Sequence, residues 1–398
     1  MPEKKGVVPR LRFPEFRDAG PWEVRSIEQL ASKIAQGGTP KTSVPEYWNG
    51  GIPWITPAEM GDDALHHYTE TTLRAISRKG LENSSAELLP ANSVIISSRA
   101  PIGYVTINKV EMATNQGCKG IIPKRDTYHE FLYFSLLVAR QRLNNLGAGA
   151  GFKEISTSTL KAFQIPVPKL PEQQKIADCL SSLDEVIVLE ARKLEALKAH
   201  KKGLMQQLFP REGETTPRLR FPEFRDAGPW EVKRLGEVCE INNGSSNAQD
   251  HVDAGEYPLF DRSLTVKRSN TYLFDCEAVI IPGEGSEFSP RYYKGKFDLH
   301  QRAYALTQFN VEGKFVFFLM DRWKARLAEQ AVKSTVLSLR MPTLENFRIT
   351  IPSKPEQQKI ADCLSSLDEM IELQAKRLEA LKQHKKGLMQ QLFPQEVD

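Results

Sequence analysis

The stretch PEQQKIADCLSSLDEVIVLEARKLEALKAHKKGLMQQLFP, residues 171–210, decides the fold because the chain contains it twice. It returns at residues 355–394 with only six substitutions. Internal repetition on this scale sets the architecture of a chain before any single motif does. Each copy opens with proline and glutamate, which suit the first turn of a helix: the proline loses no hydrogen bond there, and the carboxylate faces the positive end of the helix dipole. Each copy is therefore predicted to form one long helix.

Apolar residues recur along both copies at alternating steps of four and three, which is the spacing of a coiled-coil seam. The seam positions are Ile176, Leu180, Leu183, Ile187, Leu194, Leu197, Leu204 and Leu208 in the first copy, and Ile360, Leu364, Leu367, Ile371, Leu378, Leu381, Leu388 and Leu392 in the second. Two such seams in one chain are most simply satisfied by pairing with each other. The alternative is two amphipathic surface helices, each packed on its own domain. A Lys-Lys-Gly triplet in each copy predicts fraying or an early helix end at Gly203 and Gly387.

The apolar stripe is wider than a two-stranded seam requires. Val186 and Leu189 widen it in the first copy, and Met370 and Leu373 stand at the same positions of the second. A helix with a broad apolar face needs more than one neighbour to cover it. The extra width predicts that helices of another protein complete a bundle with this pair.

The composition is that of a soluble globular protein with two or three domains. The 398 residues are 40% hydrophobic and 26% charged, and the net charge of +4 is too mild to indicate a nucleic-acid binder by itself. Five scattered cysteines without a CxxC pair exclude zinc-finger spacings and favour reduced thiols. The chain has a polar start and no apolar run long enough to span a membrane, so we expect it in the cytoplasm.

A second repeat precedes each variable region. The sequence PRLRFPEFRDAGPWEV, residues 9–24, is repeated letter for letter at residues 217–232, and each copy is called a leader below. Its arginines and aromatic residues are compatible with base stacking. Its prolines and its aromatic anchors favour instead a clasp that seats the following domain on the helices. The order leader, variable region, helix thus occurs twice, like a ring of two units opened at one point, and we expect the two ends of the chain to lie close together.

The two variable regions, residues 25–170 and 233–354, do not resemble each other in sequence. Both are nevertheless predicted to mix strands with a helix, placed around residues 129–146 and 314–332. The predicted strands include SVIISS, TINKV, EAVIIPG, RAYALTQF and FRITIPS, and the predicted loops include GGTPKT, NGGIPW, GAGAGF, NNGSSN and PGEGSEF.

The predicted fold class is α+β, with two mixed α/β domains separated by two long helices that form an antiparallel coiled coil. Antiparallel pairing relates the two repeats by a pseudo-twofold axis. The expected boundaries are 1–170 for the first leader and domain, 171–210 for the first helix, 211–354 for the second leader and domain, and 355–398 for the second helix and a tail.

With these features the chain resembles the specificity subunit of a type I restriction-modification system, and the resemblance covers nearly all of it. The paired helices and the LRFPEF…WEV leaders carry the resemblance. So do GGTPKTSVPEYWNGGIPWIT, ISRKGLENSSAELLP, SSRAPIGYVTI and NQGCKGI in the first variable region, and YPLFDRS and EAVIIPGEGSEFSPRYYKGKFDLHQRAYAL in the second. The order and duplication of the motifs, and no single one of them, make the match specific.

The resemblance implies a DNA-reading subunit without chemistry of its own. Each variable region would be a target recognition domain that reads one half of a bipartite sequence in double-stranded DNA. The helices would separate these domains and bind two adenine-N6 methyltransferase (M) subunits, and motor-nuclease (R) subunits would complete the restriction complex. S-adenosylmethionine, Mg²⁺ and ATP are expected on the partner subunits, so no cofactor or metal is expected on this chain.

Reading DNA requires Arg or Lys for phosphates and guanines and Asn or Gln for adenines, presented on loops. The candidate DNA-binding residues are Thr39, Lys41, Lys79, Arg99, Gln116 and Lys119 in the first domain, and Ser245, Arg262, Arg268, Arg291, Tyr292, Gln301 and Arg302 in the second. The alternative for each is a surface charge or a hydrogen bond that stabilises the fold, above all for Arg99 and Arg302.

Motifs of catalysis are missing from the sequence. It contains neither the Asn/Asp-Pro-Pro-aromatic motif of an amino-methyltransferase nor a Walker A loop. Asp298, Glu312 and Lys314 match a nuclease core in residue type only, because they fall in a recognition motif and a loop. Two competing functions stay open at this point: a coiled-coil scaffold that tethers two protein-binding domains, and a self-sufficient endonuclease.

The expected DNA target is asymmetric, because the two variable regions differ. Twofold-related readers commonly sit about one helical turn of DNA apart, roughly 10–10.5 base pairs between centres. If each domain reads about three or four base pairs, that spacing leaves an unread gap of roughly six or seven.

Overall fold

The computed structural model describes residues 7–61, 63, 66–146, 154–263, 265–285, 287–333 and 336–394. Its contacts group the chain into two compact units, with Met1–Lys193 and Ala375–Asp398 in unit 1 and Leu194–Gln374 in unit 2. Each unit contains one leader, one variable region and a part of each long helix. Within the described residues, no helix is both long and apolar enough to cross a membrane.

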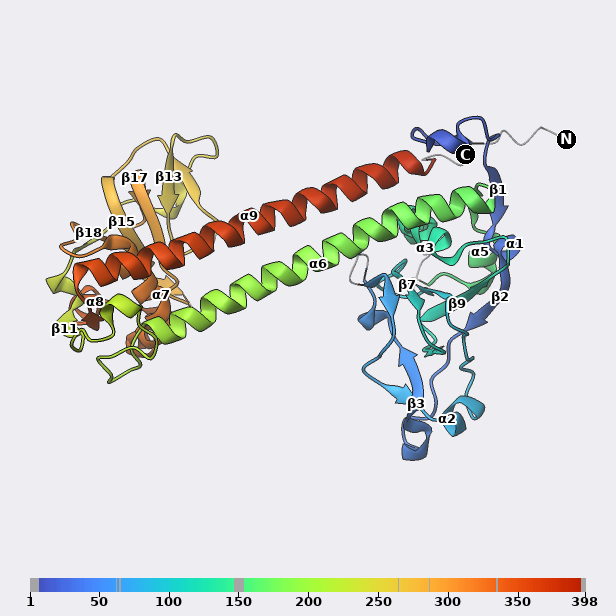
Figure 1. Ribbon diagram of the computed structural model, residues 1–398, viewed down its shortest axis with the longest axis horizontal. Coiled ribbons are helices and arrows are strands. Elements are labelled where there is room, and N and C mark those ends of the chain that lie inside the picture. The colour runs from blue at the N-terminus through green and yellow to red at the C-terminus, as the bar shows by residue number, and fades with distance from the viewer. Residues whose placement is uncertain are drawn as a thin grey trace. The chain divides into compact units, whose positions relative to one another are not determined.

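The two repeats form the predicted long helices, drawn in green and red in Figure 1. α6 spans Leu170–Leu208 and α9 spans Lys354–Leu392, 39 residues each. The predicted early end at Gly203 and Gly387 is wrong, because both helices continue through these glycines. A glycine inside a helix costs about 1 kcal/mol. Burial of the leucines that end the helices, each 2% exposed, outweighs that cost.

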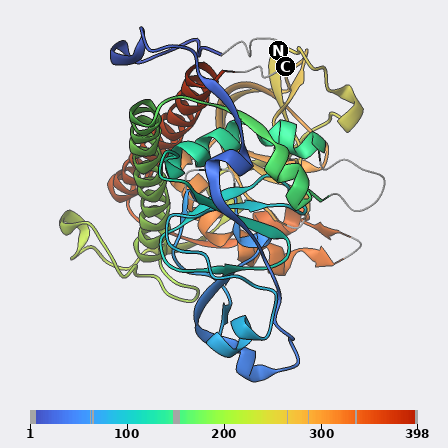
Figure 2. The same cartoon turned by 90° about the vertical axis from the view of Figure 1, so that its right-hand side faces the viewer.

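Unit 1 contains a five-stranded sheet in the order β2-β9-β6-β7-β4, a three-stranded sheet in the order β5-β3-β8, and the pair β1-β10. Its strands are β1 Glu23–Ser26, β2 Ala31–Gln36, β3 Trp48–Ile55, β4 Tyr68–Thr69, β5 Ala75–Ile76, β6 Val94–Ser97, β7 Val105–Asn108, β8 Ala113–Thr114, β9 Cys118–Pro123 and β10 Gln164–Val167. Its shorter helices are α1 Ile27–Leu30, α2 Arg78–Glu82, α3 His129–Val138, α4 Arg140–Leu146 and α5 Thr157–Ala162. Figures 1 and 2 show the segment with β3 and α2 projecting from the larger sheet.

Unit 2 contains a six-stranded sheet in the order β12-β18-β15-β17-β13-β14, a three-stranded sheet in the order β16-β20-β19, and the pair β11-β21. Its strands are β11 Glu231–Arg234, β12 Glu240–Asn243, β13 Tyr257–Phe260, β14 Lys267–Ser269, β15 Phe274–Pro282, β16 Glu284–Gly285, β17 Arg291–Leu299, β18 Ala303–Thr307, β19 Val332–Lys333, β20 Leu337–Ser338 and β21 Arg348–Ile351. Its shorter helices are α7 Gly313–Gln330 and α8 Met341–Glu345.

The two variable regions share a fold that their sequences conceal. In unit 1 the antiparallel partners run β2, β9, β6, β7, and in unit 2 they run β12, β18, β15, β17. β4 then pairs parallel with β7, and β13 pairs parallel with β17. The predicted α+β class is confirmed, and the units differ mainly in the small sheets attached to this common one.

Two local predictions are wrong. The segment NGGIPW, predicted as a loop, lies within β3, where a bulge between Trp48 and Ile52 accommodates its glycines. The helix predicted around residues 129–146 is divided into α3 and α4 at Ala139, whose ψ of 1° departs from the helical value. The predicted loop GAGAGF, residues 147–152, lies outside the described residues.

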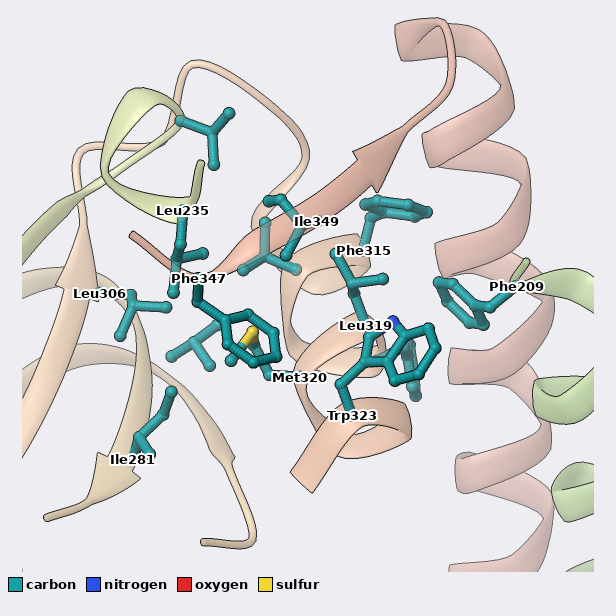
Figure 3. Close-up of a cluster of buried hydrophobic side chains, with 14 of the residues drawn as sticks. Phe209, Leu235, Ile281, Leu306, Phe315, Leu319, Met320, Trp323, Phe347 and Ile349 are labelled. Carbon is teal, nitrogen blue, oxygen red and sulfur yellow. The ribbon is translucent and has the colours of Figure 1, made fainter. Parts of the chain in front are cut away.

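In unit 2, α7 lies between the large sheet and the end of α6, and its apolar side chains pack against both (Figure 3). Figure 3 shows Phe315 and Leu319 of α7 near Phe209, which follows α6, with Leu306 of the sheet beyond the opposite side of α7. The ring centroids of Phe209 and Phe315 are 5.5 Å apart. Ile360, near the start of α9, belongs to the same buried cluster.

Unit 1 repeats this arrangement with its own residues. Phe131 of α3 lies beside Trp22 of the leader, with 5.8 Å between ring centroids. Phe393, which follows α9, lies 6.2 Å from the same tryptophan. In unit 2 the leader tryptophan, Trp230, lies 5.8 Å from Phe315 and 6.2 Å from Phe209 between ring centroids. Each unit therefore buries its leader tryptophan between the domain helix and the end of a long helix.

The predicted seam residues are all buried or half-buried, but their partners are not those of a simple two-stranded seam. Ile176 near the start of α6 joins the core of unit 1 together with Leu392 at the end of α9. Ile360 joins the core of unit 2 together with Leu208 at the end of α6. Each helix start thus packs both on its own variable domain and on the end of the other helix. A continuous coiled coil between the two stays a prediction.

Each leader clasps the start of its own long helix through a buried ion pair. Arg12 donates from Nε and Nη2 to the two carboxylate oxygens of Glu172, at 2.7 Å each. Arg220 and Glu356 repeat this geometry in unit 2, again at 2.7 Å each. The hydrogen bond to the carboxylate raises the pKa of each arginine. These contacts agree with the clasp interpretation of the leaders.

Each leader also contacts the end of the other long helix. The Leu11 N–H donates to the Gln391 carbonyl in unit 1, and the Leu219 N–H donates to the Gln207 carbonyl in unit 2, both at 3.0 Å. Segments from near the two ends of the sequence therefore meet in unit 1. The first six and last four residues, on which the expectation of neighbouring termini rests, lie outside the described residues.

The residue after each clasping glutamate holds the variable domain. Gln173 accepts a hydrogen bond from the Tyr128 N–H at 2.8 Å, and Gln357 accepts one from the Glu312 N–H at 2.9 Å. Tyr128 and Glu312 are the N-cap residues of α3 and α7. Both glutamines are buried, and each also donates to a proline carbonyl that precedes its own helix.

The long helices contact each other within each unit through the same two repeat positions. Lys385 lies 2.5 Å from Asp184 in unit 1, and Lys201 lies 2.5 Å from Asp368 in unit 2. Antiparallel pairing of two repeats predicts this reciprocal use of one lysine and one aspartate. The burial differs, because Asp184 is 3% exposed and Asp368 is 41% exposed. His67 of the first domain also lies 3.3 Å from Asp184.

Replacing Arg12 by alanine is expected to lower the free energy of unfolding by about 3–5 kcal/mol, because Glu172 then stays buried without a countercharge. Arg220→Ala, which strands Glu356 in the same way, is expected to do the same. Arg10→Ala is the matched control, since Arg10 is exposed in the same leader. Urea unfolding of the full chain, followed by tryptophan fluorescence, measures the difference. Unfolding of Arg12→Ala at the same urea concentration as the control would contradict the clasp.

Replacing Lys385 by methionine is expected to destabilise the chain by about 3–5 kcal/mol, because it leaves the buried Asp184 without its ammonium partner. Lys201→Met makes the same change at the repeat-related position, where the aspartate is open to solvent, and is expected to cost no more than about 1 kcal/mol. Thermal denaturation of both variants measures the contrast. Equal losses for the two variants would mean that the burial of Asp184 does not matter.

Candidate DNA interface and docking surface

Three loops of unit 1 meet beyond one end of its larger sheet. They follow β2, follow β6 and precede β9, three strands that are neighbours in the sheet. The Thr39 hydroxyl donates to the side-chain carbonyl of Gln116, which joins the first of these loops to the third. In the third loop the Gly117 N–H donates to the Asn115 side chain at 2.9 Å, and the Cys118 N–H donates to the Asn115 carbonyl at 3.1 Å.

A glycine lets the first loop approach the third. A Cβ atom placed on Gly37 would lie 1.7 Å from the Asn115 carbonyl oxygen, which is far inside van der Waals contact. In unit 2 a Cβ atom on Gly244 would lie 1.9 Å from the Leu299 carbonyl oxygen. The same close approach therefore occurs in both domains.

Positive side chains of unit 1 lie beside these loops. The Arg99 N–H reaches the Gly117 carbonyl at 3.3 Å, and the Arg99 side chain pairs with Glu154 at 3.0 Å. Lys119 is buried, and this burial lowers its pKa, against the opposing effect of Glu154. Thr39, Gln116, Arg99 and Lys119 are thus four of the six first-domain candidates, and the fold brings them together.

The other two first-domain candidates lie on the segment that carries β3 and α2. Lys79 pairs with Glu46 at 2.8 Å, and the Lys41 carbonyl accepts a hydrogen bond from Trp48 at 3.2 Å. Arg74 stacks on the same tryptophan, with its guanidinium carbon 3.6 Å from the ring centroid. Lys41 and Lys79 are exposed, so both are available to phosphates.

Unit 2 builds the matching loops from other residues. The Gln301 side chain donates to Asn247 at 2.7 Å, and the Gln301 N–H donates to the Ser246 carbonyl at 2.9 Å. Ser245 is exposed in the same loop. The Arg302 Nη1 atom donates to both carboxylate oxygens of Glu284, at 2.8 and 2.9 Å. Ser245, Gln301 and Arg302 therefore lie close together on two adjoining loops.

Further cations surround His300 in this loop. The burial of His300 is the main cause of its lowered pKa, and Arg302, Lys267 and Arg262 lower it further, against the opposing effect of Asp261. The His300 Nδ1 atom accepts a hydrogen bond from the Arg302 N–H at 3.1 Å, so the imidazole is neutral there. Arg262 is exposed and adds to the positive charge near the turn.

Three second-domain candidates make contacts that stabilise the fold. Arg268 donates to the carbonyls of Gly255 and Glu256 at 2.8 and 2.7 Å, and so braces a loop. Arg291 donates to the Ser263 carbonyl. Tyr292 donates to Glu277 at 2.8 Å, and burial together with this bond raises its pKa.

Two of the three residues that match a nuclease core in type, Asp298 and Glu312, have a place in the fold. Asp298 is buried and accepts hydrogen bonds from the Ser246 hydroxyl at 2.8 and 2.7 Å. Glu312 is the N-cap of α7.

Sequence reasoning missed Asn115 and His300, which shape the two turns, and Asn247, which supports Gln301. The signal was the pair Asn-Gln or His-Gln directly before a strand. This dipeptide identifies the turn only once it is known that β9 pairs with β2 and that β18 pairs with β12.

A second surface lies on the long helices. Leu189 is 62% exposed and Leu373, its repeat mate, is 66% exposed. Val186 and Met370, at the neighbouring matched positions, are 40% and 46% exposed. Each unit thus presents a copy of one apolar patch, here called the docking patch: Val186 with Leu189 in unit 1, and Met370 with Leu373 in unit 2.

Comparisons with known proteins agree over nearly the whole chain. The family model for the type I restriction modification DNA specificity domain matches residues 20–199 and again residues 228–383. The type I restriction enzyme MjaIX specificity subunit of Methanocaldococcus jannaschii is 30% identical over 401 residues, covering 93% of this chain and 92% of that protein. The EcoDI specificity subunit of Escherichia coli is 30% identical over 154 residues, covering 39% of this chain and 34% of that protein.

A solved structure supports the fold. The crystal structure of the type I restriction-modification S subunit from M. genitalium has a TM-score of 0.65 against this chain at 16% identity, and the match covers 98% of this chain and 100% of that one. The family model covers most of the chain, once in each repeat. The chain therefore belongs to the type I restriction-modification DNA specificity family, as a subunit that recognises a DNA target and leaves catalysis to partner subunits.

Proposed function

We propose that each variable domain reads one half of an asymmetric, bipartite DNA target. The observation that carries the proposal is the same loop arrangement on the same sheet, built in each domain from a different sequence. Gln116 and Gln301 lie in matching turns, while the cations around them come from different positions, such as Arg99 in one domain and Arg302 in the other. Two domains that share a fold but differ in their surface residues are suited to recognise two different half-targets.

The proposal assigns a function to each of the four predicted segments. Residues 1–170 and 211–354 form the two target recognition domains with their leaders, and residues 171–210 and 355–398 form the spacer helices and the tail. Lys41, Lys79 and Arg262, whose side chains are exposed, supply phosphate contacts, which position the domain, and the loops around the two glutamines supply base contacts; Lys119 is buried and supports its loop from within. Arg268, Arg291 and Tyr292 support the loops from within the domain.

The docking patches bind two adenine-N6 methyltransferase (M) subunits. Leucines that are 62% and 66% exposed on a helix gain stability when a partner helix covers them. The patch occurs once in each unit at the same repeat positions, which fits two copies of one partner. S-adenosylmethionine belongs to these M subunits. Mg²⁺ and ATP belong to the motor-nuclease (R) subunits, and the assembled complex acts on DNA in the cytoplasm.

Single-molecule sequencing of DNA from cells that express this chain with its methyltransferase is expected to show N6-methyladenine in one split, asymmetric motif. Exchanging residues 25–170 for the matching domain of a relative is expected to change one half of the motif and leave the other unchanged. A continuous palindromic motif would contradict the proposal. An exchange that altered only a protein partner would favour a scaffold, and cutting of DNA by the chain with Mg²⁺ alone would favour an endonuclease.

Leu189→Glu is expected to remove one M subunit, and the double variant Leu189→Glu, Leu373→Glu is expected to remove both, each with an affinity loss of about 30-fold or more. The reason is that a carboxylate would have to be buried at the centre of the contact. Leu73→Glu is the matched control, because Leu73 is 88% exposed on the first variable domain. Native mass spectrometry of the purified complexes gives the stoichiometry. Binding of two M subunits to the double variant would exclude the patches as docking sites.

A further inference from the structure

The two variable domains contain one turn that is the same in both. In the first domain it is residues 115–118 and in the second residues 300–303, and each is called the glutamine turn below. In both, the first residue accepts a backbone N–H from the fourth, at 3.1 Å in the first domain and 2.9 Å in the second. In both, the side chain of the first residue also accepts the N–H of the third, at 2.9 Å from Asn115 and 3.1 Å from His300.

The second residue of each glutamine turn is a glutamine, although the residues on either side differ. Gln116 stands between Asn115 and Gly117, and Gln301 stands between His300 and Arg302. The strand that follows each turn pairs with the first strand of its sheet in matching register, with Lys119 opposite Gln36 and Tyr304 opposite Asn243. The two glutamines therefore occupy the same place in domains whose other loop residues have diverged.

Both glutamine side chains are exposed, and both are held by the loop that follows the first strand. Thr39 donates to the side-chain carbonyl of Gln116, and the Gln301 amide donates to Asn247 at 2.7 Å. A side-chain amide has two lone pairs and two N–H groups. Each glutamine thus keeps at least one acceptor site and one donor site for a ligand after its supporting bond is made.

A residue that occurs at the same position in both domains cannot distinguish one half-target from the other. Such a residue is instead suited to recognise a feature that both half-targets contain. If each of the two M subunits proposed above methylates an adenine in its own half-target, adenine is the one base that both halves must have. A glutamine amide recognises adenine in the major groove by accepting from N6 and donating to N7, which uses both free sites of the side chain.

We propose that Gln116 and Gln301 each bind the adenine that is to be methylated in the half-target of their own domain, through N6 and N7, while the base is still stacked in the duplex. This inference rests on the proposed function. The exposed cations beside the turns, Arg99 in one domain and Arg302 and Arg262 in the other, contact the flanking phosphates. The supporting bonds from Thr39 and Asn247 fix the amide before DNA arrives.

The test combines two glutamine variants with DNA that lacks the adenine N7 atom. The target is first taken from the methylation motif, and 7-deazaadenine then replaces the methylated adenine in one half or the other. Binding of the complex of this chain with its M subunits is measured for the wild type, Gln116→Met and Gln301→Met. Methionine keeps the length of the side chain and removes both hydrogen-bonding atoms.

The wild type is expected to bind roughly 5- to 10-fold more weakly when 7-deazaadenine replaces the adenine of either half. Gln116→Met is expected to bind natural DNA roughly 10- to 100-fold more weakly and to be insensitive to 7-deazaadenine in the first half only. Gln301→Met is expected to lose sensitivity in the second half only, so each variant is the control for the other.

A glutamine that only stabilises its turn gives a different result. Its replacement would weaken binding to natural and 7-deaza DNA by the same factor in both halves, and that outcome would overturn the inference. If the variants show no contact with the adenine but the split methylation motif is present, only this inference fails and the proposed function stands. Absence of any split methylation motif would instead refute the proposed function itself.

Discussion

The arrangement of each unit depends on two neighbouring polar side chains in the first turn of a long helix. Glu172 and Glu356 bind the leader arginines, and the glutamines that follow them bind the first turn of α3 or α7. All four residues are at most 2% exposed. An apolar seam can slip by one turn at modest cost, but a slip here would leave a buried carboxylate without its guanidinium. The polar pair therefore sets the position of leader and domain on the helix.

The residues that hold each domain on its helix are repeated in both units, whereas other parts of the domains differ. Leader, helix start and the N-terminus of the domain helix have the same contacts in both units, and the core strands of the sheet keep the same order. The differences lie in the attached small sheets, which are β5-β3-β8 in unit 1 and β16-β20-β19 in unit 2. A domain attached in this way can change its DNA-facing residues without changing how it is held. This is the property that a reader of variable targets needs.

The repeated parts were predictable from sequence, and the loops were predictable only in part. The helices and the clasp follow from spacing and from literal repetition, which are local properties of the chain. The residue types of Tyr292 and Arg268 suit DNA, yet the two side chains bind Glu277 and the backbone of Gly255. Their partners are more than ten residues away and depend on strand register, which residue types alone do not reveal. The prediction that the first long helix ends at Gly203 is wrong for a related reason: burial of residues beyond the glycine overrides its low helix propensity.

The two long helices are nearly identical in sequence but differ in their surroundings, and this limits how freely the domains can be exchanged. Asp184 and Asp368 occupy the same repeat position and each meets a lysine of the other helix, but only Asp184 is enclosed, with His67 of the first domain at 3.3 Å. Tyr133 stacks on this histidine, with the ring centroids 4.2 Å apart. A different first domain without a histidine at this position would change the cost of burying Asp184. The variable domain thus contributes to the stability of the helix contact on which it is mounted. A domain that reads a new target must also fit the charge of Asp184.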